Sequence, residues 1–148
     1  IAAAIGRDTY PATAMTADEC LALSWLTTSW QSFVAKYEGF ATENYKVVGE
    51  RMGEMNNRLV ELATQQVEQR VAKAVLRLIR QSGKNVDGGV EIDFPITRKD
   101  LSEMTATTLH TVSRLLSAWE KNGVVKSSRR HVVVTDPQHL ELISEKYD

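Results

Sequence analysis

Two helical patterns separated by three residues constrain the fold of this chain more than any other feature. In TRKDLSEM, residues 97–104, Thr97 has a side chain that caps helices, and Asp100 follows three positions later, as in a capping box. After the turn TAT, Thr107 or Thr108 can cap a second helix. The spacing therefore predicts two short helices joined by a tight turn, which is a helix-turn-helix.

The second helix is predicted to have a buried and an exposed face. Its apolar residues recur at the spacing i, i+3, i+4, i+7, which places them on one side, namely Val112, Leu115, Leu116 and Trp119. The opposite side carries His110, Ser113, Arg114 and Ser117. In the first helix, the predicted inner face consists of Leu101 and Met104.

The exposed face of the second helix suits duplex DNA. Thr107, Thr108 and Thr111 surround a helix N-terminus, where free N–H groups and the positive end of the dipole favour phosphate. Arg114 lies about one turn further along, and its planar guanidinium matches O6 and N7 of guanine. The alternative is a pair of packed helices with a capped terminus and a solvated arginine.

A basic hairpin follows this helix. Residues 124–134, VVKSSRRHVVV, predict two short strands around a polar turn, a wing with Arg129 and Arg130 at its tip. There both arginines can meet backbone phosphate, although solvated turn residues are the alternative. Asp136 and Pro137 are then expected to begin a last helix, as its N-cap and first residue.

Basic residues are concentrated around these elements. The whole chain has a formal net charge of -1. Residues 96–135 nevertheless hold seven lysines and arginines against three acidic residues, whereas the flanking segments are net acidic. A basic segment in a near-neutral chain suggests a polyanionic partner, although a solvated face is the commoner origin of such a bias.

A proline-free segment before these elements repeats with a heptad period. Spacings of three and four alternate through Tyr45, Val48, Met52, Met55, Leu59, Leu62 and Gln66. Such a stripe can lie on its own domain, or it can pair with the same stripe of a second chain. Flanking polar residues such as Glu50 and Arg51 favour the homodimer. Near Gln66 the apolar set changes, so the helix is expected to change face or break there.

The remaining segments give weaker signals. Residues 12–26 alternate loosely, as a half-buried strand would, and residues 30–37 have the spacing of a short amphipathic helix. The turn-rich stretch QSGKNVDGG, residues 81–89, is expected to be a domain boundary. Residues 90–94 alternate as a short strand would, up to Pro95.

Taken together, the stretch ITRKDLSEMTATTLHTVSRLLSAWEKNGVV resembles the winged helix of the Crp/Fnr family of bacterial transcription regulators. The long helix before it, including QVEQRVAKAVLRLIRQ, resembles that family's dimerisation helix and the first helix of its DNA-binding domain. YPATAMTADECLALSW resembles the closing strands of the family's effector-binding β-roll, a domain related to cyclic-nucleotide-binding domains.

The resemblance implies a mainly α fold with small β elements. Residues 1–40 would be the C-terminal remnant of the β-roll, 41–66 the dimerisation helix and 67–148 the winged helix-turn-helix domain. It also implies that most of the β-roll would precede Ile1.

The resemblance assigns expected DNA contacts residue by residue. Thr108 and Thr111 fall on phosphate-contacting positions, and Arg114 falls on the guanine-reading arginine. Relatives often have Arg-Glu where this chain has Leu109-His110, so the base preference that those residues give is not transferred. The expected DNA-contacting set is Arg98, Thr107, Thr108, Leu109, His110, Thr111, Ser113, Arg114, Ser117, Arg129 and Arg130.

A further departure lies in the turn, where Ala106 replaces the glycine that is frequent in the family. Ala106 would cost about 1 kcal/mol if that residue has a positive φ.

Cyclic AMP is not expected as the effector. Family members that bind it carry an Arg-Ser pair that grips the cyclic phosphate. Here those positions read Asp8-Thr9, and a carboxylate repels phosphate, although the adjacent Arg7 leaves a one-residue shift open. The adenine-facing Thr-Ser of the long helix appears as Met55-Asn56. No cofactor is expected in this chain, and the identity of the effector stays open.

The leading function is a homodimeric, sequence-specific DNA-binding transcription regulator in the cytoplasm, acting on an inverted-repeat site under the control of an effector. RNA polymerase is a candidate further partner. The alternative is a winged helix that docks another protein. An enzyme is not expected, because the three histidines lack metal-ligand spacing and no nucleophile is paired with a base. No apolar run reaches the roughly 18 residues that a membrane span needs.

Overall fold

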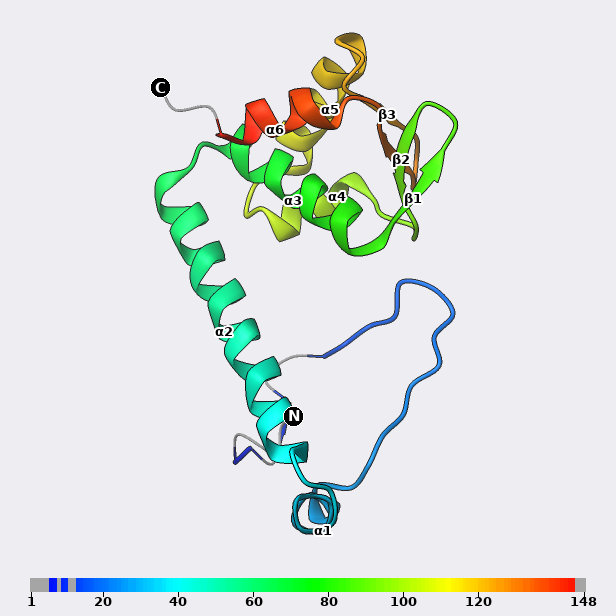
Figure 1. The fold of residues 1–148 in the computed structure, drawn as a ribbon. Coiled ribbons are helices and arrows are strands. Elements are labelled where there is room, and N and C mark those ends of the chain that lie inside the picture. The colour runs from blue at the N-terminus through cyan, green and yellow to red at the C-terminus, as the bar shows by residue number, and fades with distance from the viewer. Residues whose placement is uncertain (1–5, 8, 11–12, 146–148) are drawn as a thin grey trace. The chain divides into compact units, whose positions relative to one another are not determined.

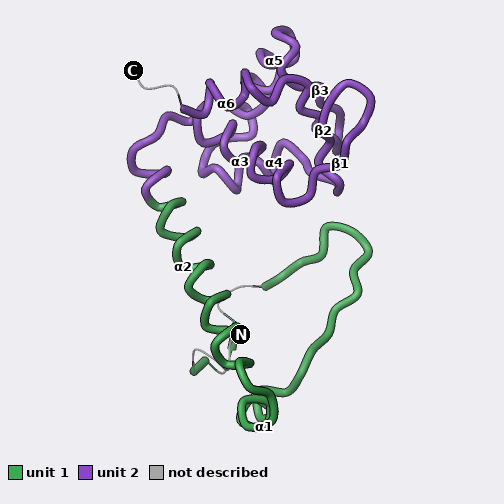
Figure 2. Tube along the Cα trace, in the orientation of Figure 1, with its two compact units in different colours: residues 1–59 green, residues 60–148 purple. Residues whose placement is uncertain are grey.

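The computed structural model describes residues 6–7, 9–10 and 13–145 of the 148-residue chain. Its Cα trace divides into two compact units, residues 1–59 and residues 60–148 (Figure 2). The division falls inside one long helix, so the last turn of that helix belongs to the second unit.

The first unit is helical where it has regular structure. A single 3-10 turn, η2 (Thr27–Ser29), leads into α1 (Trp30–Lys36). Gly39, at a φ of 81°, then turns the chain into α2 (Phe40–Thr64). Helix α1 confirms the short helix predicted over residues 30–37.

The strand predicted over residues 12–26 is wrong within the part of it that the structure describes. Residues 13–26 form no strand, and Leu21, Leu23 and Trp25 are exposed, Leu21 by 97%. Residue 12 lies outside the described residues. A strand needs a neighbour to pair its N–H and C=O groups. Among the described residues of the first unit no segment is a strand, so the alternating pattern has nothing to pair with.

Helix α2 spans 25 residues, and none of them is buried. It ends at Thr64, so the break predicted near Gln66 is confirmed. Gln66 has extended backbone and is the N-cap of the next helix, α3 (Val67–Ser82), where its N–H donates to Gln69 Oε1 at 2.7 Å. The predicted place of Gln66 in the apolar stripe is therefore wrong, because Gln66 caps α3 and does not continue the face of α2.

The second unit is built on α3, which buries six of its residues. Helix α6 (Pro137–Glu145) lies along α3, and α4 (Arg98–Met104) packs beside it (Figure 1). Helix α5 (Leu109–Lys121) completes the helical layer. The largest fully buried side chains come from every part of this unit and include Ile92, Leu101, Leu116, Trp119 and Leu140.

Four short antiparallel strands cover one end of the core in the order β1-β2-β4-β3. The strands are β1 (Gly83–Val86), β2 (Gly89–Ile92), β3 (Val125–Ser127) and β4 (Val132–Val134). The β3–β4 pair confirms the predicted wing, and β2 confirms the strand predicted after residue 89, although Phe94 lies beyond it.

The domain boundary predicted at residues 81–89 is wrong. These residues end α3 and form most of the β1–β2 hairpin, with Gly88 at a φ of 81° in its turn, inside the second unit. Polar turn residues occur in hairpins as well as in linkers. Here the pairing of Val90 with Val134 joins the hairpin to the wing, and that long-range pairing leaves no local sequence signal.

The predicted start of the last helix is confirmed. Helix α6 begins at Pro137, and Asp136 Oδ1 accepts a hydrogen bond from the His139 N–H at 2.9 Å. An aspartate cap followed by proline satisfies a free N–H of the first turn without losing a helical hydrogen bond.

Candidate nucleic-acid interface

Capping residues position the two helices of the helix-turn-helix. Thr97 Oγ1 accepts from the Asp100 N–H at 3.1 Å, and Asp100 Oδ2 accepts from the Thr97 N–H at 2.7 Å, so the predicted capping box is confirmed. The hydrogen bonds from the Thr97 hydroxyl and then from its backbone N–H lower the pKa of Asp100. At the start of α5, Thr108 is the N-cap, and its Oγ1 accepts from the Thr111 N–H at 3.1 Å.

Between the caps the chain reverses at Ala106, whose φ is 49°. The Thr107 N–H donates to the Ser102 carbonyl at 3.0 Å and the Ala106 N–H to the Glu103 carbonyl at 3.4 Å, which is the Schellman pattern. A residue with a Cβ is strained in this conformation, so alanine costs free energy here that glycine would not.

Helix α5 has the two faces that its sequence predicts. Val112, Leu116 and Trp119 are buried, and Leu115 is partly buried. The other face consists of the exposed His110 and Arg114 and the half-buried Ser113 and Ser117.

Met104 of α4 does not belong to the inner face as predicted, because it is 39% exposed. Helix α4 ends at Met104 and the chain then turns, which leaves this side chain at the rim of the core.

The first turn of α5 combines hydroxyl groups with one apolar side chain. Thr108 Oγ1 and Thr111 Oγ1 lie 2.9 Å apart, so one of the two hydroxyls donates to the other, and the second keeps its O–H for an outside acceptor such as a phosphate oxygen. Thr107 is half-buried, and Leu109 is 51% exposed at the first position of the helix. The first N–H groups of a helix have no intrahelical acceptor, so this end can receive an anion.

The wing brings its arginines to the same side as the start of α4. Its turn is closed by a hydrogen bond from the Ser128 N–H to the His131 carbonyl at 2.9 Å. The Arg130 carbonyl accepts from the Ile96 N–H at 3.0 Å, which fixes the wing beside the residue that precedes the Thr97 cap. Arg129 and Arg130 themselves are exposed.

A groove of about 440 Å³ joins these three elements, with a lining of Thr97, Arg98, Lys99, Leu109, Ser128 and Arg129. Three of its six lining residues are cationic and none is acidic. Such a groove attracts an anion, and the Ser128 hydroxyl beside the cations can donate to a phosphate oxygen.

The structure adds three residues to the set predicted from sequence. Lys99 and Ser128 line the groove, and their positions next to Arg98 and Arg129 were the available signal. The third residue is Glu120, whose Oε1 accepts a hydrogen bond from the Ser127 N–H at 2.7 Å. No sequence pattern predicted this bond, because a turn separates the two residues in the chain. Arg98 lines the groove as well, and its Nη2 also donates to Ser127 Oγ at 3.0 Å.

The apolar stripe of α2 is accessible along its length. Tyr45, Met52, Met55, Leu59 and Leu62 are exposed and Val48 is half-buried; Met52 and Met55 are each 65% exposed. Residues at heptad spacing lie along one side of a helix, and a contiguous apolar surface of this kind marks an interaction site.

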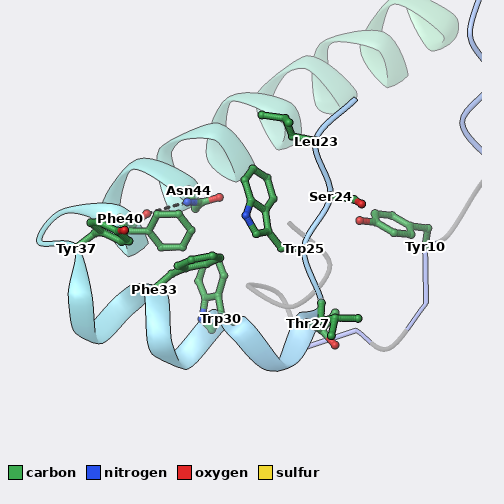
Figure 3. Close-up of a pocket in the computed structure, with 11 residues that line it drawn as sticks. Tyr10, Leu23, Ser24, Trp25, Thr27, Trp30, Phe33, Tyr37, Phe40 and Asn44 are labelled. Atoms are coloured by element: carbon green, nitrogen blue, oxygen red, sulfur yellow. Dashed lines mark hydrogen bonds between the residues drawn. The ribbon is translucent and has the colours of Figure 1, made fainter. Parts of the chain in front are cut away.

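A pocket in the first unit is lined mainly by aromatic side chains. Phe33 lies between three other rings, with ring centroids 6.1 Å from Trp25, 6.1 Å from Tyr37 and 5.5 Å from Phe40 (Figure 3). The Asn44 side chain donates to the Phe40 carbonyl at 2.8 Å at the rim. The pocket has a volume of about 640 Å³, and its described lining carries hydroxyl and amide groups but no charged side chain.

Within the described residues, no group of three or more His, Cys, Asp and Glu side chains could hold a metal ion. In the same residues, no helix combines the length and apolar character needed to cross a membrane. The Asp8-Thr9 pair, part of the sequence argument against cyclic AMP, includes Asp8, which lies outside the described residues.

Known proteins share both the sequence and the fold of this chain. It is 24% identical over 127 residues to a "CRP-like cAMP-activated global transcriptional regulator" of Mycobacterium tuberculosis, covering 86% of this chain and 57% of that protein. It is 41% identical over 51 residues to the "Transcriptional activator protein FnrL" of Cereibacter sphaeroides, covering 34% of this chain and 21% of the relative. This chain thus spans little more than half of the mycobacterial relative.

The fold of a solved mutant of CooA from Carboxydothermus hydrogenoformans matches with a TM-score of 0.73 at 23% identity, covering 80% of this chain and 55% of that one. The family model of the Crp-like helix-turn-helix domain matches residues 69–143, which include the turn, α5 and the wing and make up half of the chain. Through this domain the chain belongs to the Crp/Fnr family.

Proposed function

We propose that this chain binds duplex DNA in a sequence-specific manner and regulates transcription as a homodimer. The observation that carries the proposal is the groove shared by α4, α5 and the wing, where Arg98, Lys99 and Arg129 lie beside the open end of α5. When duplex DNA binds such a groove, its phosphates can contact the cations while its base edges in the major groove contact α5.

In this proposal α5 is the recognition helix. Arg114, exposed about one turn inside the helix, reads a guanine in the major groove, while Thr107, Thr108 and Thr111 hold phosphate. His110, Ser113 and Ser117 lie on the same face and complete the contact surface. Leu109 meets a thymine methyl group, an apolar contact that suits its exposed position.

The proposed homodimer forms through α2. Helix α2 pairs with its symmetry mate through Tyr45, Val48, Met52, Met55, Leu59 and Leu62, because their exposed stripe has the spacing of a coiled-coil seam. A two-fold dimer presents two recognition helices, so the operator should be an inverted repeat with half-sites roughly 34 Å apart.

An effector would control this regulator. Residues 1–40 would contribute to effector binding, 41–66 to dimerisation and 67–148 to DNA binding, in the cytoplasm, with RNA polymerase as a further partner. The mycobacterial relative is described as cAMP-activated. Cyclic AMP is not carried over, because this chain has Met55-Asn56 where cyclic-AMP-binding members have Thr-Ser.

Selection of binding sites from random duplexes tests the proposal directly. The chain should enrich inverted repeats, and its affinity for an enriched site should fall steeply between about 50 mM and 200 mM salt, because bound phosphates release counterions. Reversal of the groove charge, by Lys99→Glu with Arg129→Glu, should abolish the enrichment. If no duplex binds in a salt-dependent manner, the winged helix docks a protein instead.

A further inference from the structure

Glu120 is an acidic residue within the basic segment, and its carboxylate accepts two hydrogen bonds from one residue of the wing. Its Oε1 accepts from the Ser127 N–H at 2.7 Å and from the Ser127 hydroxyl at 2.7 Å. Glu120 belongs to the last turn of α5, and Ser127 is the last residue of β3. The carboxylate therefore joins the recognition helix to the point where the wing turn begins.

The Ser127 hydroxyl extends this connection to α4. It donates to Glu120 and accepts from Arg98 Nη2 at 3.0 Å, so one hydroxyl links an acid on α5 to a base on α4. Both Ser127 and Arg98 are half-buried, which limits competition from water for these bonds.

The wing depends on such lateral bonds because its own ladder is short. Strands β3 and β4 have three residues each, and β3, which carries Ser127, is the edge strand of the sheet and pairs with β4 alone. On the far side of the turn, the Arg130 carbonyl is held by the Ile96 N–H at 3.0 Å. On the near side the Glu120–Ser127 bonds perform the same task, so the turn that carries Arg129 and Arg130 is held at both of its ends, Ser127 and Arg130.

We propose that Glu120 is a positioning residue for DNA binding: it anchors the near side of the wing so that Arg129 and Arg130 face phosphate together. This inference rests on the proposed DNA-binding function. Without the anchor, both arginines would have to be ordered when DNA binds, and that ordering lowers affinity.

The proposal predicts an effect opposite in sign to simple electrostatics. Removing an acid from a DNA-binding face normally strengthens binding, since it removes repulsion from phosphate. Glu120→Ala should instead weaken binding to every duplex by about fivefold, because the wing loses its anchor. The slope of log affinity against log salt should stay close to that of the parent chain, because both arginines still reach phosphate once DNA has ordered the wing.

Two variants separate the hydrogen bonds from the charge. Glu120→Gln retains a side-chain oxygen that can accept from Ser127, so it should bind DNA at least as tightly as the parent chain. Glu103→Ala removes an exposed acid of α4 that pairs with Lys99 of the same helix at 3.6 Å, and it should bind slightly more tightly at low salt. Ser127→Ala removes only the hydroxyl bonds and should weaken binding by a smaller factor than Glu120→Ala.

Hydrogen exchange measures the anchor without DNA. In Glu120→Ala the Ser127 and Ser128 amides should exchange at least about tenfold faster, while amides of α3 keep the parent rate. This readout survives even if the parent chain binds no DNA, so failure of the DNA-binding function and failure of the anchor are distinguishable.

A double-mutant cycle completes the test. In a chain that already carries Arg129→Ala and Arg130→Ala, Glu120→Ala should change DNA affinity no further, because no wing cation remains to be positioned. The proposal is overturned if Glu120→Ala behaves like Glu103→Ala, if Glu120→Gln is as weak as Glu120→Ala, or if the loss persists in the double-arginine variant.

Discussion

Helices α2 and α3 follow each other in the chain and both carry an apolar face, yet α3 buries six residues and α2 buries none. The face of α3 is covered by α4, α6 and strand β2, which belong to the same compact unit. The stripe of α2 has no such cover among the described residues of its unit. Periodicity in the sequence thus identifies which side of a helix is apolar, whereas the rest of the fold determines what packs against that side.

The two helices also differ in what their polar groups do. Arg70 of α3 donates to the Thr105 carbonyl at 3.2 Å and to the Gln65 carbonyl at 2.8 Å, and Trp119 Nε1 donates to Glu68 at 3.0 Å. These bonds connect α3 to the residue that caps the end of α4, to α5 and to Gln65, the residue that follows α2. Among the charged residues of α2, Arg51 and Glu54 are exposed, whereas Glu61 near its end accepts from Arg77 Nη1 of α3 at 3.3 Å.

Charged residues placed in the α2 stripe should have the largest effect, because they test whether the stripe is covered by a second chain. Met52→Lys with Leu59→Lys should convert the dimer to a monomer, because like charges would face each other in a desolvated seam. The penalty of several kcal/mol should raise the dimer dissociation constant by at least about 1000-fold. Light scattering should report half the parent mass.

The matched control places lysine elsewhere on the same helix. Asn57→Lys changes an exposed residue off the stripe and should leave the mass unchanged. An unchanged mass in the double-lysine variant would show that the stripe is not the dimer seam.

Leucine-to-alanine changes at one covered and one uncovered position give the next largest effect. Leu116 is fully buried, so Leu116→Ala should destabilise the second unit by about 2–5 kcal/mol. Leu59 is 64% exposed, and Leu59→Ala should change the stability of that unit by less than about 0.5 kcal/mol. Hydrogen exchange of α3 amides measures both values, since these amides open with the whole unit. Equal losses from the two variants would contradict the division between a covered core and an uncovered seam.

Local sequence was sufficient for the features that depend on neighbouring residues. The Thr97–Asp100 box, the Thr108 cap and the Asp136-Pro137 start of α6 all involve groups within a few positions of each other, and all three are confirmed. The strand expected within residues 12–26 and the boundary expected at residues 81–89 were wrong because each depended on distant pairing partners.

The candidate site shows the same limit. The faces of α5 followed from periodicity, and the arginines of the wing followed from the turn that they occupy. The bonds from Glu120 to Ser127 and from Arg98 to Ser127 cross between elements, and nothing in the spacing indicates them. The DNA contacts and the dimer seam themselves stay predictions.

Alanine substitutions of one arginine in α5 and one in the wing should have effects of intermediate size on DNA affinity. Arg114→Ala should cost about 1–3 kcal/mol on the preferred site and flatten the preference at one G·C pair of each half-site. Arg129→Ala should weaken binding to all sequences alike and reduce the salt slope by about one. Affinities for the operator and its single-base variants at several salt concentrations measure both effects.

Uniform weakening by Arg114→Ala, with base preferences intact, would make Arg114 a phosphate contact. Specificity would then have to come from His110, Leu109 or the shape of the DNA.

The smallest expected effect, and the only stabilising one, concerns backbone conformation in the turn before α5. Ala106 has a φ of 49°, which glycine adopts without the Cβ clash, so Ala106→Gly should stabilise the second unit by about 1 kcal/mol. Ala118, exposed inside α5, is the matched control, and glycine there should destabilise by about 1 kcal/mol because it loosens a regular helix. Denaturant unfolding of the two variants should therefore give changes of opposite sign. If Ala106→Gly is also destabilising, the Schellman turn does not hold residue 106 at positive φ in solution, and the α4–α5 geometry must relax by another route.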